Sequence, residues 1–173
     1  MDSRMIQPEV RAFRVPAGTV HAAVSILIAA PPERAAAVYR AVERWGEIYP
    51  GTIASARIVR AGDGWKDILV VHKQEGLVPN TLFELSETEI GLEEHKKKFD
   101  AWFINRFLPA ANGGTQYSIG GYIRLKGLYR LLAPLLERYV RRRMVKSMRA
   151  YVLDPLKIAA EQERRGENVP GPK

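Results

Sequence analysis

Between residues 52 and 127 the chain reads as a series of strands joined by tight turns. A Gly-Asp-Gly sequence at 62–64 separates two strand-like segments, which is typical of a β-hairpin. An Asn-Gly-Gly sequence at 112–114 marks another turn, and the three lysines at 96–98 are interpreted as the solvated face of a strand. Six strands in this order predict an antiparallel sheet, because strands joined by short turns run in opposite directions.

The segment before this series predicts one further strand and two helices. Residues 19–28 place apolar side chains at every second position, as in a half-buried strand. Two prolines at 31–32 then open a region of helical spacing, and proline suits the first turn of a helix. We therefore expect short helices near 32–40 and 41–48, ending at a Pro-Gly pair.

The last long segment, about 128–163, predicts a helix that packs on the sheet. A helical wheel puts one set of side chains on a single face along its length: Tyr129, Ala133, Leu136, Val140, Met144, Ser147, Met148 and Tyr151. Pro134 either kinks this helix or marks its true start. Two adjacent glycines at 120–121 favour a bulge or sharp curl in the preceding strand. The sheet is therefore expected to curve around the helix.

A second set of side chains lies beside that face. It comprises Leu128, Leu131, Leu132, Leu135 and Tyr139, and one or two turns later the same flank holds Arg142, Arg143, Lys146 and Arg149. Nine basic residues and one acidic residue between 124 and 149 account for the whole net charge of +8. A local positive patch indicates an anionic surface or ligand nearby. Contact with an anionic membrane is therefore one prediction, carried by Leu131, Leu135, Arg142, Arg143 and Lys146. The alternative is that the leucines pack on the two short helices or across a homodimer interface.

Several classes of chemistry lack support in the sequence. The absence of cysteine excludes disulfides and thiolate metal sites, and fits a reducing, cytoplasmic location. The phosphate-loop, dinucleotide-binding, zinc-protease and nucleophile-elbow motifs are absent. The three histidines fall in three separate strands. We therefore expect no metal, no cofactor and no nucleic-acid partner. We also expect no secretory signal, because the N-terminus lacks an apolar core.

Aromatic residues with a polar tip are the main candidates for a ligand site. They surround the predicted sheet and helix, and either fill the core or line a cavity. The candidate ligand-binding residues are Trp45, Tyr49, His72, Trp102, Asn105, Tyr117, Tyr122, Leu136 and Val140.

Two sequence segments carry a resemblance to a known superfamily. SILIAAPPERAAAVYRAVERWGEIYPG (25–51) and LPAANGGTQYSI (108–119) resemble the first strand with its helix entry and the Gly-Gly-Thr turn of START-like and birch-pollen-allergen-like proteins, which include polyketide cyclase/dehydrase and lipid-transport families. The resemblance covers about 20–160. It implies an α+β helix-grip fold, in which a curved seven-stranded antiparallel sheet wraps around a long C-terminal helix and encloses an apolar cavity. The expected organisation is an N-terminal extension (1–18), the domain itself (19–163) and a disordered tail (164–173).

Three hypotheses about function follow from this resemblance. The first is binding or transfer of a hydrophobic small molecule, such as a lipid, fatty acid or polyketide-like compound. The second is a polyketide aromatase or cyclase that acts in the same cavity, although no catalytic motif is matched residue by residue. The third is an accessory or oligomerising protein whose cavity is closed by its own side chains. An apolar cavity favours the first, convergent titratable groups favour the second, and a filled cavity favours the third.

Overall fold

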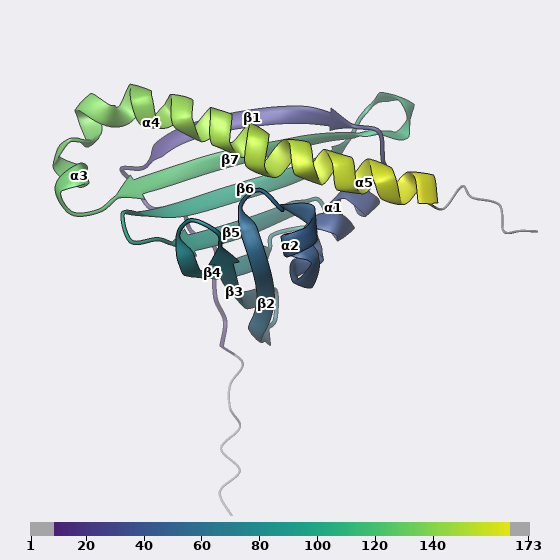
Figure 1. Ribbon diagram of the computed structural model, residues 1–173, viewed down its shortest axis with the longest axis horizontal. Coiled ribbons are helices and arrows are strands. Elements are labelled where there is room, and N and C mark those ends of the chain that lie inside the picture. Colours follow the sequence, from purple (N-terminus) through teal and green to yellow (C-terminus); the bar gives the residue numbers. More distant parts are fainter. Residues whose placement is uncertain (1–8, 167–173) are drawn as a thin grey trace, which may run out of the picture.

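The computed structural model describes residues 9–166, and within them the chain forms one seven-stranded antiparallel sheet (Figure 1). The strands are β1 (Val20–Ile28), β2 (Ile53–Gly62), β3 (Trp65–His72), β4 (Gly76–Glu84), β5 (Glu89–His95), β6 (Phe99–Pro109) and β7 (Thr115–Leu125). Their order in the sheet is β1-β7-β6-β5-β4-β3-β2, so the first strand pairs with the last. The predicted meander and its seventh strand are confirmed.

The helices lie on one face of this sheet, which we call the inner face (Figure 1). Between β1 and β2 come α1 (Pro32–Arg40), the 3-10 turn η1 (Val42–Arg44) and α2 (Trp45–Ile48), and a short turn η2 (Ala111–Gly113) joins β6 to β7. After β7 come α3 (Leu128–Leu131), α4 (Ala133–Met148), the π-helical segment η3 (Arg149–Leu153) and α5 (Asp154–Gly166). Pro134 stands in the first turn of α4 and thus marks the start of that helix. The predicted helix-grip architecture is confirmed, including the two short helices after the first strand.

The π-helical segment changes which residues of the long helix face the sheet. Met144 and Met148 are buried, as the wheel predicted, and α-helical spacing would continue this face at Tyr151. The wider π turn shifts the face, so that Leu153, Leu156 and Ala160 are buried instead. Tyr151 is 49% exposed, and its predicted place on the packing face was wrong for this reason.

The glycine pair in β7 accommodates the helix without interrupting the strand. A bulge or a sharp curl was expected here, and the pairing with β1 and β6, which runs continuously through Gly120 and Gly121, excludes the bulge. A Cβ at Gly121 would lie 2.9 Å from Sδ of Met148 and 3.2 Å from Cε of Met144. The glycine therefore lets α4 approach β7 closely. Register shifts occur in β2 instead, between Ile53 and Ser55 and between Ile58 and Arg60.

Two other segments differ from the sequence interpretation. The lysines at 96–98 form the turn between β5 and β6 and not the face of a strand. On the outer face of the sheet, Phe13 packs edge-on against Phe83 with ring centroids 5.6 Å apart, and Nε1 of Trp65 donates to the carbonyl of Glu9 at 3.0 Å. Part of the predicted N-terminal extension is thus packed on the sheet. Residues 1–8 and most of the predicted tail (167–173) lie outside the described residues.

Candidate ligand-binding site on the inner face

A buried hydrogen-bonded group occupies the inner face beneath α1. Asn105, which is fully buried in β6, donates to the hydroxyl of Tyr39 at 3.0 Å and to the carbonyl of Ile90 at 3.2 Å. Its Oδ1 accepts from the hydroxyl of Tyr117 at 2.7 Å. Trp45 joins this group through Nε1, which donates to the carbonyl of Tyr39 at 2.8 Å. Three of the predicted ligand-binding residues, Asn105, Tyr117 and Trp45, therefore lie together in this packed group, and Tyr39 is a member that the sequence analysis missed.

Aromatic rings fill the space around this group. The rings of Phe107 and Tyr117 stack with centroids 4.7 Å apart, and Tyr39 packs against Trp45 at 5.8 Å. Tyr49 is also buried, edge-on to Trp45 at 6.1 Å, and its hydroxyl has no hydrogen-bond partner among the described residues. Burial raises the pKa of Tyr39, Tyr49 and Tyr117 well above the usual value, so each phenol stays protonated. This end of the inner face is therefore closely packed and provides hydrogen-bond donors, not bases.

A second polar cluster lies on the same face in β3, β4 and β5. Nδ2 of the buried Asn80 donates to Oε1 of Glu94 at 3.3 Å. Lys96 forms ion pairs with Glu75 at 2.8 Å and with Glu94 at 3.3 Å. Within the described part of the chain, two atoms of this cluster are buried without a partner: Nε2 of His72 and Oδ1 of Asn80. We call His72, Asn80 and Glu94 the polar cluster.

The protonation of this cluster follows from its surroundings. Burial lowers the pKa of His72, and the nearby Glu94 offsets this only in part, so the imidazole is neutral at pH 7. Burial alone would also lower the pKa of Lys96, but Glu94 and Glu75 outweigh it and the pKa is raised. Lys96 is therefore a stable cation that is already paired with carboxylates. The neutral His72 ring keeps an unused nitrogen that can either donate or accept a hydrogen bond, depending on its tautomer.

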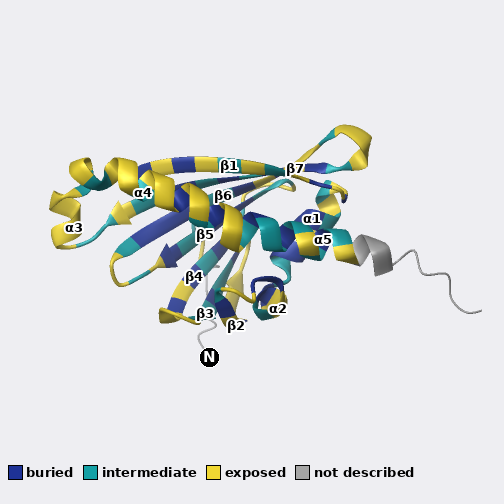
Figure 2. Ribbon diagram, turned by 45° about the horizontal axis from the view of Figure 1, so that its top comes forward, coloured by how far each residue is buried: buried dark blue, intermediate teal, exposed yellow. Residues whose placement is uncertain are grey.

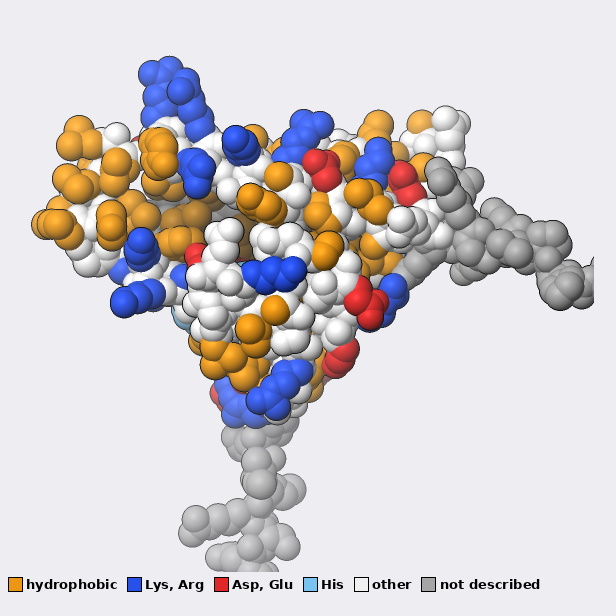
Figure 3. Space-filling model, viewed as in Figure 1, with side chains coloured by type: hydrophobic (Ala, Val, Ile, Leu, Met, Phe, Trp, Pro, Cys, Tyr) orange, Lys and Arg blue, Asp and Glu red, His pale blue; other side chains and the backbone are white. Residues whose placement is uncertain are grey.

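Half-buried apolar side chains lie between α4 and the sheet. Leu136 and Val140 of α4 are half-buried, as are Phe103 of β6 and Ile123 of β7. α4 packs mainly over β1 and β7, so it leaves the inner face of the central strands less covered. Figure 3 shows the surface hollowed just below α4, with hydrophobic side chains in the hollow. The inner face thus combines apolar side chains under α4 with the polar cluster of β3, β4 and β5.

Two of the predicted ligand-binding residues lie elsewhere. Trp102 and Tyr122 are on the outer face, because side chains alternate along a strand and Asn105 and Gly121 face the helices. Nε1 of Trp102 donates to Oε1 of Glu93 at 3.2 Å, and Tyr122 stacks on His21 at 4.5 Å. Their predicted place between sheet and helix was wrong. The same alternation, applied to β4 and β5, is the signal that could have found Asn80 and Glu94.

Comparison with known proteins places this geometry in a known fold. The scan against family models and the search of curated proteins found no match. Among solved structures, the Zhui aromatase/cyclase from Streptomyces sp. R1128 matches with a TM-score of 0.72 and 15% identity over 87% of this chain and 98% of that chain. A START superfamily protein from Mycobacterium smegmatis matches with a TM-score of 0.64 and 14% identity, over 84% of this chain and 99% of that one. Ara h 8.0201 gives 0.62 and 18%, over 83% and 98%.

The chain has the START-like helix-grip fold. At this level of identity the likeness establishes the fold and leaves the ligand open. In this START-like domain the sheet, α4 and α5 correspond to the expected architecture, and the polar cluster lies on the face that the helices cover.

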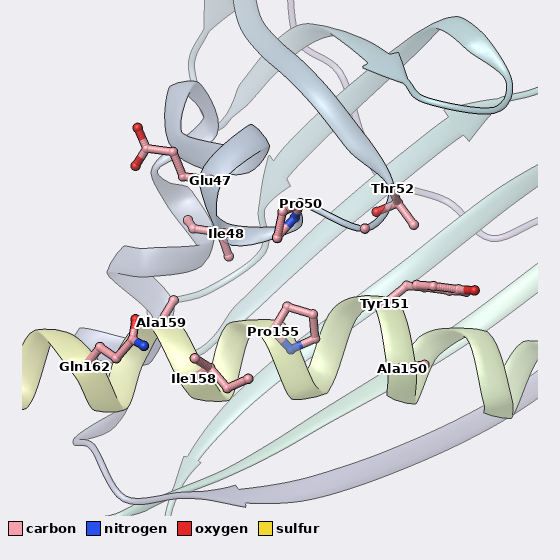
Figure 4. Close-up of a pocket in the computed structure, with 11 residues that line it drawn as sticks. Glu47, Ile48, Pro50, Thr52, Ala150, Tyr151, Pro155, Ile158, Ala159 and Gln162 are labelled. Carbon is pink, nitrogen blue, oxygen red and sulfur yellow. The ribbon is translucent and has the colours of Figure 1, made fainter.

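The START-like domain also has a groove on its surface between α2 and α5, with a volume of about 310 Å³ (Figure 4). Ile48 and Pro50 line one wall, and Tyr151, Pro155 and Ile158 line the other. Tyr151 and Ile158 are exposed, so the groove is shallow and open to solvent. None of the predicted site residues lines it.

The described part of the chain offers neither a metal site nor a membrane-spanning helix. Between residues 9 and 166, three or more His, Asp or Glu side chains are nowhere grouped so that they could hold a metal ion. None of the described helices is both long and apolar enough to cross a bilayer.

Proposed function

We propose that this START-like protein binds a hydrophobic small molecule that carries at least one hydroxyl group. The apolar part would lie under α4, against Leu136, Val140 and Phe103, and the hydroxyl would meet the polar cluster. Two observations carry this proposal: Nε2 of His72 and Oδ1 of Asn80 are both buried, and neither has a hydrogen-bond partner among residues 9–166. A buried polar atom without a partner costs about 1–3 kcal/mol, which a matching ligand can recover.

The chemistry of the polar cluster favours a neutral hydroxylated ligand over a fatty acid. Oδ1 of Asn80 can only accept, so the ligand must donate a hydrogen there. Lys96, the nearest cation, is already paired with Glu75 and Glu94. A free carboxylate placed beside Glu94 would therefore meet repulsion that nothing in the cluster offsets. Of the ligands considered from the sequence, polyketide-like phenols fit this cluster better than lipids with a carboxylate head.

Isothermal titration calorimetry with two probes tests this function. A hydroxylated tricyclic aromatic should bind, and oleate should bind more weakly. Replacing Asn80 by leucine or His72 by phenylalanine should weaken binding of the aromatic roughly tenfold each, because one hydrogen bond is lost. Tyr122→Phe is the matched control, since Tyr122 lies on the outer face, and its affinity should equal that of the wild type. Equal affinities for all four proteins, or no binding, would refute the proposal.

A second candidate function is an aromatase or cyclase reaction at the same site. It is supported by His72, whose neutral imidazole is able to take up a proton at pH 7 and faces the inner side of the sheet. Product analysis by mass spectrometry after incubation with a linear poly-β-ketone separates the two. A cyclised product that disappears in His72→Phe, at a ligand concentration at which the aromatic probe still saturates the variant, would establish the reaction.

A further inference from the structure

Large apolar side chains are exposed along α3 and the start of α4. Leu128 is 71% exposed, Leu131 76%, Leu135 82% and Tyr139 63%. Together with Leu132 we call these residues the leucine flank. Figure 2 shows α3 and the beginning of α4 as mostly exposed, in contrast to the later part of the long helix. Contiguous apolar exposure of this kind marks an interaction surface.

The leucine flank has no cover within the described chain. α1 and α2 pack against α5, at the opposite end of the long helix, as Figure 1 shows. The alternative in which the leucines pack on the two short helices is therefore wrong. The five side chains of the leucine flank are therefore open to solvent in the described chain. Only a surface outside residues 9–166 could cover them.

Basic side chains border the leucine flank on the helix itself. Arg142 follows Leu135 by seven residues and Lys146 follows Tyr139 by seven, which in an α-helix places each pair on one stripe. Arg142, Arg143 and Lys146 are all exposed. Glu137 is the only acidic residue between 124 and 149, and it is paired with Arg141. The exposed stripe thus passes from apolar to strongly positive.

A second basic border comes from a distant part of the sequence. The backbone nitrogen of Lys126 donates to the carbonyl of Lys98 at 3.0 Å, and its Nζ donates to the carbonyl of Lys96 at 2.9 Å. These bonds hold the β5–β6 turn next to the residue that precedes Gly127 and α3. Lys97 and Lys98 are exposed in that turn. In Figure 3 hydrophobic side chains gather over α3 and the start of α4, with Lys and Arg on both borders.

We propose that the leucine flank docks on the surface of an anionic lipid membrane. Helices that lie in the membrane interface combine large apolar side chains with flanking Lys and Arg, as here. The leucines would enter the boundary between headgroups and acyl chains, while the basic borders meet anionic headgroups. A second copy of the chain fits less well, because a symmetric pairing through this flank would bring the basic stripes of α4 together. An anionic bilayer is the occupant that matches both the apolar and the charged residues.

Co-sedimentation with vesicles tests the docking. Vesicles of phosphatidylcholine with about 30 mol% phosphatidylserine should carry the protein down, and neutral phosphatidylcholine vesicles should not. Raising NaCl from about 0.05 M to about 0.5 M should weaken the binding, because salt screens the headgroup charge. Equal binding to neutral vesicles, or no binding to anionic ones at low salt, would overturn the proposal.

Two pairs of substitutions separate the apolar and the charged contributions. L131S with L135S should reduce vesicle partition roughly tenfold or more, because two exposed leucines no longer enter the lipid. R142Q with K146Q should reduce it about 25-fold, at about fivefold per basic residue. The matched controls are L77S with L108S, two exposed leucines elsewhere on the sheet, and R57Q, an exposed arginine in β2. These controls should partition as the wild type does.

A fluorescent label distinguishes lipid from a second protein chain. The chain contains no cysteine, so L135C provides a single labelling position, and L77C provides the control. An environment-sensitive dye at position 135 should shift its emission to the blue with anionic vesicles, and the dye at position 77 should not. A blue shift that depends on protein concentration without vesicles would identify a second copy as the occupant and overturn membrane docking.

Discussion

The imidazole of His72 links the proposed site to the response of the protein to acid. Its side chain lies on the inner face, where Nε2 is buried without a hydrogen-bond partner among residues 9–166 and where the charge of Glu94 acts on it. Burial lowers its pKa below the value of about 6.5 that an unfolded chain shows. The unfolded state therefore binds a proton more readily than the folded state does.

This difference predicts how stability depends on pH at the scale of one residue. The contribution of the neutral His72 side chain to the free energy of unfolding is fully present above the unfolded pKa of about 6.5. It is lost as the pH falls through the lower pKa of the folded state. Urea unfolding of the wild type between about pH 8 and pH 5 should thus show a falling free energy. His72→Gln keeps a polar side chain that does not titrate, and its curve should be flatter. Parallel curves for the two proteins would contradict the prediction.

The residues of β6 show how far single positions could be predicted. Asn105 and Trp102 were both predicted to line the inner side of the sheet, but they are three positions apart, and alternation puts Asn105 on the inner face and Trp102 on the outer face. Positions that are an odd number apart lie on opposite faces, so alternation alone excludes an inward place for both residues. Which of the two faces inward could not be predicted, because both faces of this strand carry large apolar side chains. On the outer face, Trp102 is covered in part by Arg124, whose guanidinium lies 5.2 Å from the ring.

At the scale of elements, the turn between β6 and β7 explains the Gly-Gly-Thr pattern. Asn112 and Gly113 adopt positive φ values of 60° and 71°, which asparagine and glycine tolerate best. A Cβ at Gly114 would lie 2.8 Å from the carbonyl oxygen of Ile28. Thr115 then donates from its hydroxyl to the carbonyl of Ala30 at 2.6 Å. The turn therefore ties β7 to the end of β1.

Gly114→Ala should loosen this attachment. The new Cβ would press on a backbone oxygen that cannot move without displacing β1, so we expect a loss of about 1–3 kcal/mol in the free energy of unfolding. Gly51→Ala is the control, because the nearest atom to its Cβ is a ring carbon of Tyr151 at 3.8 Å, an ordinary contact. Thermal and urea unfolding measure both variants. Equal stability of the two would refute the role of Gly114.

The order of elements was more predictable than their internal irregularities. The alternation of apolar residues and the turn residues predicted the strands, and helical spacing predicted the long C-terminal helix. The π-helical segment at Arg149–Leu153 was not predictable, since its signal is a shift of the buried positions that appears only once the partners are known. The lysines at 96–98 were placed in a strand because neither glycine nor proline marks that turn.

At the scale of the whole molecule, residues before β1 cover the face of the sheet that has no helix. The guanidinium of Arg11 lies 4.1 Å from the centre of the Trp65 ring and pairs with Asp67 at 2.7 Å. Phe13 fits against Gly91, where a Cβ would come within 2.8 Å of its ring. The sheet is thus packed on both faces, which accounts for the large apolar residues on its outer side.

Phe13→Ala should destabilise the whole domain through this outer layer. The ring is half-buried against Phe83, so we expect a loss of about 1–2 kcal/mol, less than for a fully buried phenylalanine. Val10→Ala is the matched control, because Val10 is 89% exposed and should change stability by less than about 0.5 kcal/mol. Urea unfolding followed by tryptophan fluorescence compares them. The same midpoint for both variants would show that the segment contributes nothing.

The pairing of β1 with β7 has a consequence for the order in which the chain can fold. β2 to β6 each pair with a neighbour in sequence, so these hairpins can form as soon as they leave the ribosome. Among the described strands β1 pairs with β7 alone, and Val20 pairs with Ile123 across about a hundred residues of intervening chain. Until β7 has been synthesised, the apolar segment that forms β1 therefore has no strand to pair with. The nascent chain is therefore most exposed to misfolding during its synthesis, before β7 is available for pairing.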